Sequence, residues 1–172
     1  MQNIILTGFM GTGKTTVGRL LAEKLKLPFV DVDAAIEARE GTSINDIFAQ
    51  KGEAYFRRLE TEVLREILAQ DGQVIAAGGG ILLKEENREM LRRRGKLVCL
   101  TASPAVIFQR LQSKKDRPLL SASPSVMKER IEQLLAARES LYRQVAIQVN
   151  TDFKEPEEVA AAIAALINET GI

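Results

Sequence analysis

A glycine-rich segment near the N-terminus constrains the fold of this 172-residue chain more than any other feature. Residues 8–15 read Gly-Phe-Met-Gly-Thr-Gly-Lys-Thr, which fits the pattern G-x-x-x-x-G-K-[ST] in full. A strand with an apolar centre is predicted before it at 3–7, and apolar positions at helical spacing follow it over 14–26. A strand, a glycine-rich turn and a helix in this order surround a phosphate with backbone N–H groups. The segment predicts a nucleotide-binding loop, with Lys14 on the β- and γ-phosphates and Thr15 on Mg²⁺, and leaves the phosphate acceptor open.

The rest of the chain alternates between short apolar runs and longer helical patterns. Further strands are predicted at 28–33, 73–77, 96–101 and 145–150, the last with the two-residue alternation typical of a sheet edge. Helices are predicted at 34–40, 43–51, 53–70, 85–94, 103–112, 123–144 and 156–168. Residues 113–122 are polar and charged, which predicts a loop. The alternation favours a three-layer α/β/α fold with a five-stranded parallel sheet, and the length favours one domain, 1–172.

The residue types that the chain lacks exclude several classes of catalytic and metal site. The chain has no histidine, which excludes Ser-His-Asp hydrolysis, Cys-His chemistry and His-ligated zinc. Its single cysteine, Cys99, excludes an internal disulfide and a cysteine-cluster metal site. A net charge of +1 is too small for bulk binding to nucleic acid. Because the sequence has no signal-like N-terminal region and no membrane-length apolar run, we expect a cytoplasmic protein with neither a nucleic-acid nor a membrane partner.

Two carboxylates, Asp31 and Asp33, close the second predicted strand. Alternation along a strand would place both side chains on one face, at the sheet edge where ligands of parallel α/β folds bind. One could hold the water shell of a metal ion while the other accepts a proton from an attacking hydroxyl. An alternative role for Asp33 is to cap the helix that follows it.

Three arginines are candidates for anion binding. Arg57 could be tethered by Glu53 and Glu60 on its own helix, or could be an ordinary solvated arginine. Arg117 lies in the charged loop and could close over a triphosphate, or the loop could serve solubility alone. Arg138 could form a surface salt bridge. If Arg57 and Arg138 face one pocket, they favour a substrate that carries a carboxylate.

A triple glycine, 78–80, follows the third predicted strand. Glycine in regular structure costs roughly 0.5–1 kcal/mol relative to alanine, so three in a row require a reason. Close approach of the backbone to a ligand is the interpretation we favour, and a plain tight turn is the alternative.

These motifs together resemble the shikimate kinase family of P-loop enzymes. The resemblance runs nearly end to end and rests on six segments at family-like spacing: residues 8–16, 31–33, 56–60, 78–80, 117–120 and 138–142. It implies ATP-dependent phosphorylation of the shikimate 3-hydroxyl, which yields shikimate 3-phosphate and ADP on the route to chorismate. It also implies the strand order 2-3-1-4-5, a monomer, a substrate-binding region near 33–61 and a lid at 113–122.

The resemblance also assigns roles by position. The implied catalytic residues are Asp33, Lys14 and Arg117. The implied ATP-binding residues are Gly11, Thr12, Gly13, Lys14, Thr15, Thr16, Arg110, Arg117, Lys154 and Pro156. The implied shikimate-binding residues are Asp33, Arg57, Gly79, Gly80 and Arg138. Thr15 is implied as the direct Mg²⁺ ligand, with Asp31 holding the metal through water.

One position departs from the family pattern, and two other functions compete. Ala76 stands where many members have Ser or Thr, which can help to order the water around the metal. A kinase acting on gluconate or a nucleoside monophosphate would share the phosphate loop, as would a non-catalytic nucleotide switch. The set of Asp33, Arg57 and Arg138 argues against a nucleobase acceptor, and the intact set of Lys14, Thr15, Asp31 and Asp33 argues against a switch.

Overall fold

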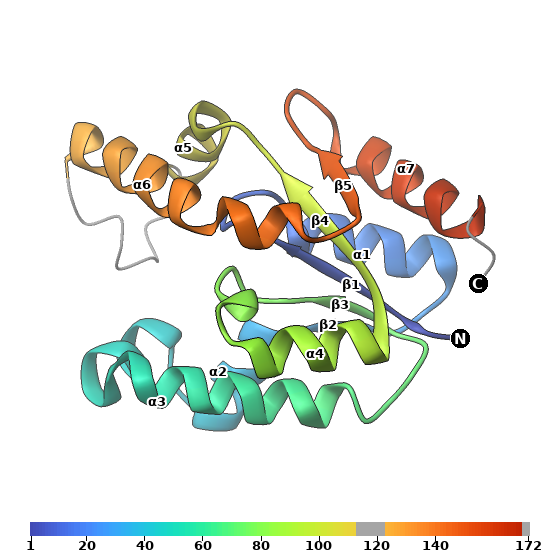
Figure 1. Ribbon diagram of the computed structural model, residues 1–172, viewed down its shortest axis with the longest axis horizontal. Coiled ribbons are helices and arrows are strands. Elements are labelled where there is room, and N and C mark those ends of the chain that lie inside the picture. Colours follow the sequence, from blue (N-terminus) through green and yellow to red (C-terminus); the bar gives the residue numbers. More distant parts are fainter. Residues whose placement is uncertain (113–122, 170–172) are drawn as a thin grey trace.

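Five parallel strands form the middle layer of the molecule (Figure 1). The computed structural model describes residues 1–112 and 123–169. The strands are β1 (Asn3–Gly8), β2 (Phe29–Asp31), β3 (Val74–Ala76), β4 (Gly95–Thr101) and β5 (Ile147–Asn150), in the order β2-β3-β1-β4-β5. The order that the resemblance implied is therefore confirmed, and β5 is an edge strand as its alternation predicted.

Alternate residues of the strands pack against different sets of helices. Ile4 and Leu6 of β1 lie in a core with residues of α1 (Lys14–Leu25) and α7 (Pro156–Glu169). Ile5, between them, lies in the second core, on the opposite side of the sheet. That core is formed with α2 (Val32–Glu40), α3 (Ile44–Ile67), α4 (Glu85–Arg94), α5 (Pro104–Gln112), α6 (Pro124–Arg143) and the short helix η1 (Ile81–Leu83). The sheet is thus covered on both faces, which is why successive residues in the middle of β1, Ile4, Ile5 and Leu6, are all apolar and buried.

The second strand is shorter than the sequence predicted, and this changes the environment of the two carboxylates. We expected a strand over 28–33 with Asp31 and Asp33 on one strand face, but β2 ends at Asp31 and α2 begins at Val32. The Asp31 carboxylate caps α2 by accepting a hydrogen bond from the Ala34 N–H at 3.2 Å. Asp33 therefore lies in the first turn of a helix, and the capping role belongs to Asp31.

The segments predicted as helices at 43–51 and 53–70 form one element, α3, interrupted at Gly52. Gly52 has φ 79° and ψ 171°, outside the helical range, so the chain changes direction there. Ser43 is the cap residue just before α3, and its hydroxyl oxygen accepts a hydrogen bond from the Asp46 N–H at 3.1 Å. The predicted loop at 113–122 lies outside the described residues. No helix in the described part of the chain has the length and apolar character needed to cross a bilayer.

Candidate active site

A cleft of about 390 Å³ opens at the carboxyl edge of the sheet. It lies at the carboxyl ends of β1, β2 and β3, which is where ligands of open parallel sheets bind. Its lining contains most of the predicted nucleotide and metal residues, together with two of the predicted shikimate-binding residues, Asp33 and Gly79. The nucleotide and metal residues are Gly11, Thr12, Gly13, Lys14, Thr15, Thr16, Asp31, Arg110, Lys154 and Pro156. Residues from distant parts of the sequence thus converge at one edge.

The glycine-rich loop between β1 and α1 is held in shape by its own hydrogen bonds. The buried Thr12 hydroxyl donates to the Phe9 oxygen at 2.7 Å. The Lys14 ammonium donates to the Gly8 oxygen at 2.8 Å and to the Phe9 oxygen at 2.9 Å, so it lies across the mouth of the loop. A phosphate entering the loop would meet both the start of α1 and a lysine already held nearby.

Thr15 and Asp31 meet beside this loop. The Thr15 hydroxyl donates to an Asp31 carboxylate oxygen at 2.6 Å, although β2 and α1 are separate elements. Within residues 1–112 and 123–169 no three acidic, cysteine or histidine side chains cluster as a metal cage. Mg²⁺ is usually held by one or two protein oxygens together with substrate phosphates and water. This hydroxyl–carboxylate pair at the edge of a phosphate loop fits that ion.

Asp33 and the triple glycine approach each other closely. A Cβ atom at Gly78 would lie 2.8 Å from an Asp33 carboxylate oxygen. A Cβ atom at Gly80 would lie 2.5 Å from the nitrogens of the Arg57 guanidinium. Because glycine has no Cβ atom, residues 78–80 can pass between the Asp33 carboxylate and the Arg57 guanidinium, which larger residues would displace. The segment is also a turn, as the alternative interpretation held, because the Ile81 N–H donates to the Gly78 oxygen at 3.1 Å.

Arg57 is anchored by the two acids predicted as its tethers. Its guanidinium lies 2.8 Å from a Glu60 oxygen and 3.4 Å from a Glu53 oxygen. Its side chain is only 16% exposed, so its interpretation as a solvated arginine is wrong. Glu60 is 1% exposed, and this burial raises its pKa, an effect that the Arg57 charge opposes. A buried acid thus fixes the direction of a base beside the glycine segment.

Arg138 and Tyr142 reach the same segment from α6. The Arg138 guanidinium approaches the Gly79 oxygen at 3.4 Å, and the Tyr142 hydroxyl donates to that oxygen at 2.8 Å. Arg138 also lies over the Phe9 ring, with 5.7 Å to its centroid. Its interactions therefore face inward, not toward a surface salt bridge. The glycine segment lies between Arg57 on α3 and Arg138 on α6.

The far end of the cleft is formed by α5 and the turn between β5 and α7. Arg110 donates to the Gly11 oxygen at 3.1 Å, to the Thr151 hydroxyl oxygen at 3.0 Å and to the Thr151 carbonyl oxygen at 2.8 Å. Lys154 donates to the Asn150 oxygen at 3.0 Å, and Pro156 begins α7. Arg110 therefore ties the phosphate loop to the β5–α7 turn. Arg117 lies outside the described residues.

Comparison with known proteins identifies the family. The shikimate kinase family model matches residues 10–168. The chain belongs to the shikimate kinase family. A shikimate kinase from Thermodesulfovibrio yellowstonii is 47% identical over 163 residues, which cover 95% of this chain and 93% of that protein. One from Geobacter sulfurreducens is 45% identical, covering 98% of this chain and 92% of that protein.

Solved shikimate kinases share the fold throughout. The structure of the Acinetobacter baumannii enzyme in complex with shikimate is 39% identical, with a TM-score of 0.94, and covers all of this chain and 96% of that chain. The Aquifex aeolicus enzyme gives 39% identity and a TM-score of 0.85, with 99% and 98% covered. The resemblance inferred from motifs is therefore confirmed.

Sequence reasoning overlooked two features of the site. Tyr142 was part of a recognised segment but was given no role, because a tyrosine on a helix carries no signal of the carbonyl that it will meet. Thr151, which lines the cleft and accepts from Arg110, follows a strand and has no motif around it. Ala76 does line the cleft, beside Asp31 in the strand register, so this edge of the cleft lacks a hydroxyl at that position.

Proposed function

We propose that this chain transfers the γ-phosphate of ATP to the 3-hydroxyl of shikimate, giving shikimate 3-phosphate and ADP. The observation that carries the proposal is the position of the glycine segment: Gly79 lies in the cleft of the phosphate loop and against Arg138, and Gly80 lies against Arg57. A phosphate donor and a small acid can therefore lie end to end at one edge of the sheet. The family and its shikimate-bound member from A. baumannii support this acceptor.

The acceptor is held through its carboxylate. Arg57 and Arg138 supply forked N–H donors that match a carboxylate, and Gly79 and Gly80 supply backbone contacts between them. Since Glu60 fixes the Arg57 guanidinium in advance, little side-chain freedom is lost when shikimate binds. Residues 33–61 thus form the main substrate-binding region.

The transfer step depends on position and charge. Lys14 exchanges its loop carbonyls for the β- and γ-phosphates, and the loop N–H groups hold the phosphate oxygens. Asp33 orients the attacking hydroxyl and accepts its proton, which the absence of histidine leaves to a carboxylate. Phosphoryl transfer needs little covalent assistance, so these groups suffice when the two substrates are aligned.

Thr15 and Asp31 are the residues that would hold Mg²⁺, Thr15 directly and Asp31 through water. When bound there, Mg²⁺ neutralises charge on the β- and γ-phosphates. Removal of divalent ions with EDTA should abolish turnover, and added Mg²⁺ should restore it.

The remaining assignments follow the family. Gly11, Thr12, Gly13, Thr16, Arg110, Lys154 and Pro156 are assigned to ATP. Arg117 and the lid at 113–122, which lie outside the described residues, are assigned to its phosphates. We place the whole chain, 1–172, in one cytoplasmic kinase domain that acts as a monomer.

An acceptor panel tests the proposed function. ADP formation by the purified protein should require shikimate, with gluconate and a nucleoside monophosphate giving no increase over the rate without acceptor. A higher rate with either rival would assign a different acceptor, and acceptor-independent hydrolysis or no hydrolysis at all would favour a nucleotide switch.

A further inference from the structure

The carbonyl of Gly79 receives two donors from one face of α6. Arg138 and Tyr142 are four residues apart, so their side chains project from the same side of the helix. The Tyr142 hydroxyl is the nearer donor, at 2.8 Å against 3.4 Å for Arg138. No catalytic role for a tyrosine is needed by the proposed chemistry, so this contact requires its own explanation.

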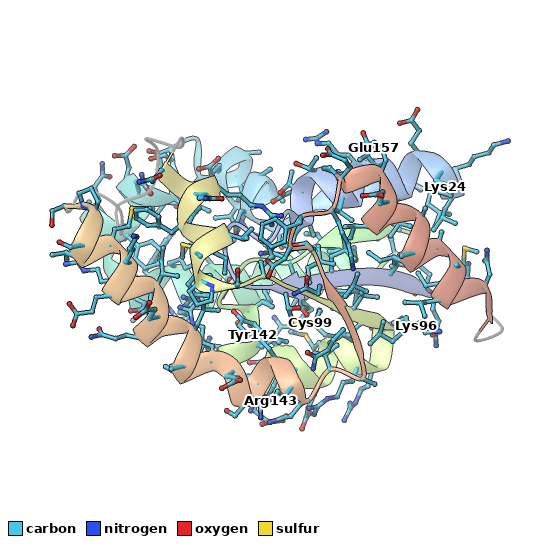
Figure 2. The ribbon with its side chains drawn as sticks, turned by 90° about the horizontal axis from the view of Figure 1, so that it is seen from above. Lys24, Lys96, Cys99, Tyr142, Arg143 and Glu157 are labelled. Carbon is cyan, nitrogen blue, oxygen red and sulfur yellow. The ribbon has the colours of Figure 1, made fainter. Side chains whose placement is uncertain are left out.

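Tyr142 is built into the fold in a way that fixes its hydroxyl. The residue is 7% exposed and belongs to the core on the α6 side of the sheet. Figure 2 shows it lying inward near Cys99 of β4, whereas the next residue, Arg143, lies at the periphery. Burial raises the pKa of Tyr142 to about 12, although the charge of Arg138 and a hydrogen bond from it act in the opposite direction. The phenol therefore remains a donor throughout the physiological pH range, oriented by a rigid core.

Because the peptide group is planar, the hydrogen bond from Tyr142 to the Gly79 oxygen also affects the orientation of the Gly80 N–H. The oxygen of Gly79 and the N–H of Gly80 belong to one planar peptide group, and a trans peptide directs them to opposite sides. Fixing the oxygen consequently fixes the direction of the N–H. Among the described residues, no hydrogen-bond acceptor takes the Gly80 N–H. Glycine has unusual backbone freedom, so this peptide would rotate readily without an external anchor.

We propose that Tyr142 is a positioning residue for the acceptor, which holds the Gly79–Gly80 peptide so that the Gly80 N–H faces the substrate carboxylate between Arg57 and Arg138. This inference rests on the proposed function. Tyr142 touches neither substrate; it acts through the Gly79 carbonyl and through Arg138. The hydroxyl thus couples α6 to the segment after β3, and its loss should loosen shikimate binding alone.

Tyr142→Phe tests this inference, since it removes one oxygen and keeps the buried ring. We expect KM for shikimate to rise about tenfold, the effect of one lost hydrogen bond of ordinary strength. KM for ATP and the melting temperature should stay close to those of the unsubstituted enzyme. Gln148→Ala is the matched control, because the Gln148 amide donates to the backbone oxygen of Tyr142 at 3.3 Å and touches no part of the site. It should leave both KM values unchanged.

The outcomes separate the inference from the proposed function. An active enzyme whose KM for shikimate is unaffected by Tyr142→Phe overturns the inference alone. A variant that loses ATP affinity and thermal stability as much as shikimate affinity also overturns it, because the hydroxyl would then be structural. An unsubstituted enzyme that does not phosphorylate shikimate overturns the proposed function and the inference together.

Discussion

Asp31 and Asp33 are two residues apart and face different partners. Asp31 is engaged by the Thr15 hydroxyl and the Ala34 amide, whereas Asp33 lies against the glycine segment and lines the cleft. These contacts suit a role for Asp31 at the metal site and a role for Asp33 at the hydroxyl of the acceptor. We predict that Asp33→Asn lowers kcat by about 100-fold or more, the usual effect of losing a general base, with KM for ATP nearly unchanged.

Steady-state kinetics at saturating ATP check this prediction. Asp71→Asn, at an exposed position in the turn before β3, is the matched control and should behave as the unsubstituted enzyme. A normal kcat for Asp33→Asn would remove Asp33 from the mechanism.

Arg57 and Arg138 are expected to act on the acceptor and not on the nucleotide. Truncating one half of a buried charge pair costs roughly 2–5 kcal/mol, so Arg57→Ala or Arg138→Ala should raise KM for shikimate by at least about 30-fold. Arg93→Ala is a control, since this side chain is 78% exposed. Loss of ATP binding with KM for shikimate unchanged would show that Arg57 and Arg138 do not bind the carboxylate of the substrate.

We expect the affinity for the acceptor to depend on pH through Glu60. Burial raises the pKa of Glu60, so this acid takes up its proton at a higher pH than a solvated glutamate does. Its protonated form no longer holds the Arg57 guanidinium as an ion pair. We predict that KM for shikimate rises as the pH is lowered, beginning at a pH above that at which a solvated carboxylate such as the substrate's takes up its proton.

Glu60→Gln isolates this effect. The variant should have a raised KM for shikimate at every pH and a flatter dependence on pH, measured by initial rates in one buffer series. An unchanged pH profile in Glu60→Gln would mean that another group causes the dependence.

At the scale of elements, α3 and α6 each have a serine at the N-terminal capping position. Ser43 caps α3 through a hydrogen bond, whereas Ser123 stands at the same position of α6 without one. Losing a serine cap costs about 1 kcal/mol, so Ser43→Ala should lower the free energy of unfolding by that amount, measured by urea denaturation. Ser123→Ala should have less effect, and an equal loss in both variants would contradict the role of the cap bond.

The sequence predicted elements well where periodicity was long and poorly where a side chain decided a boundary. The sequence predicted the sheet and the helices because burial on both faces of the sheet requires apolar runs. The ends of these elements in the structure differ from the predicted ends by a few residues. The end of β2 was wrong by two residues, since the Asp31 carboxylate starts α2 earlier than alternation indicates. The contact of Tyr142 with Gly79 joins residues 63 positions apart, and no local pattern encodes such a pairing.

Across the whole molecule, a net charge of +1 conceals a local concentration of charged side chains. Lys14 and Arg110 line the cleft, and Arg57 and Arg138 flank the glycine segment beside it. Asp31 and Asp33 line the same cleft, and Glu53 and Glu60 pair with Arg57. The sheet thus gathers charged groups of both signs at one edge, while the molecule remains almost neutral.

The product of a complete reaction tests this account most directly. Purified protein, ATP, Mg²⁺ and shikimate are incubated to completion, and the products are followed by phosphorus and proton NMR. We predict one ADP for each shikimate consumed, with the new phosphate on the 3-hydroxyl. ADP formed without phosphorylated shikimate, or a phosphate on another hydroxyl, would contradict the placement of the acceptor between Asp33 and the two arginines.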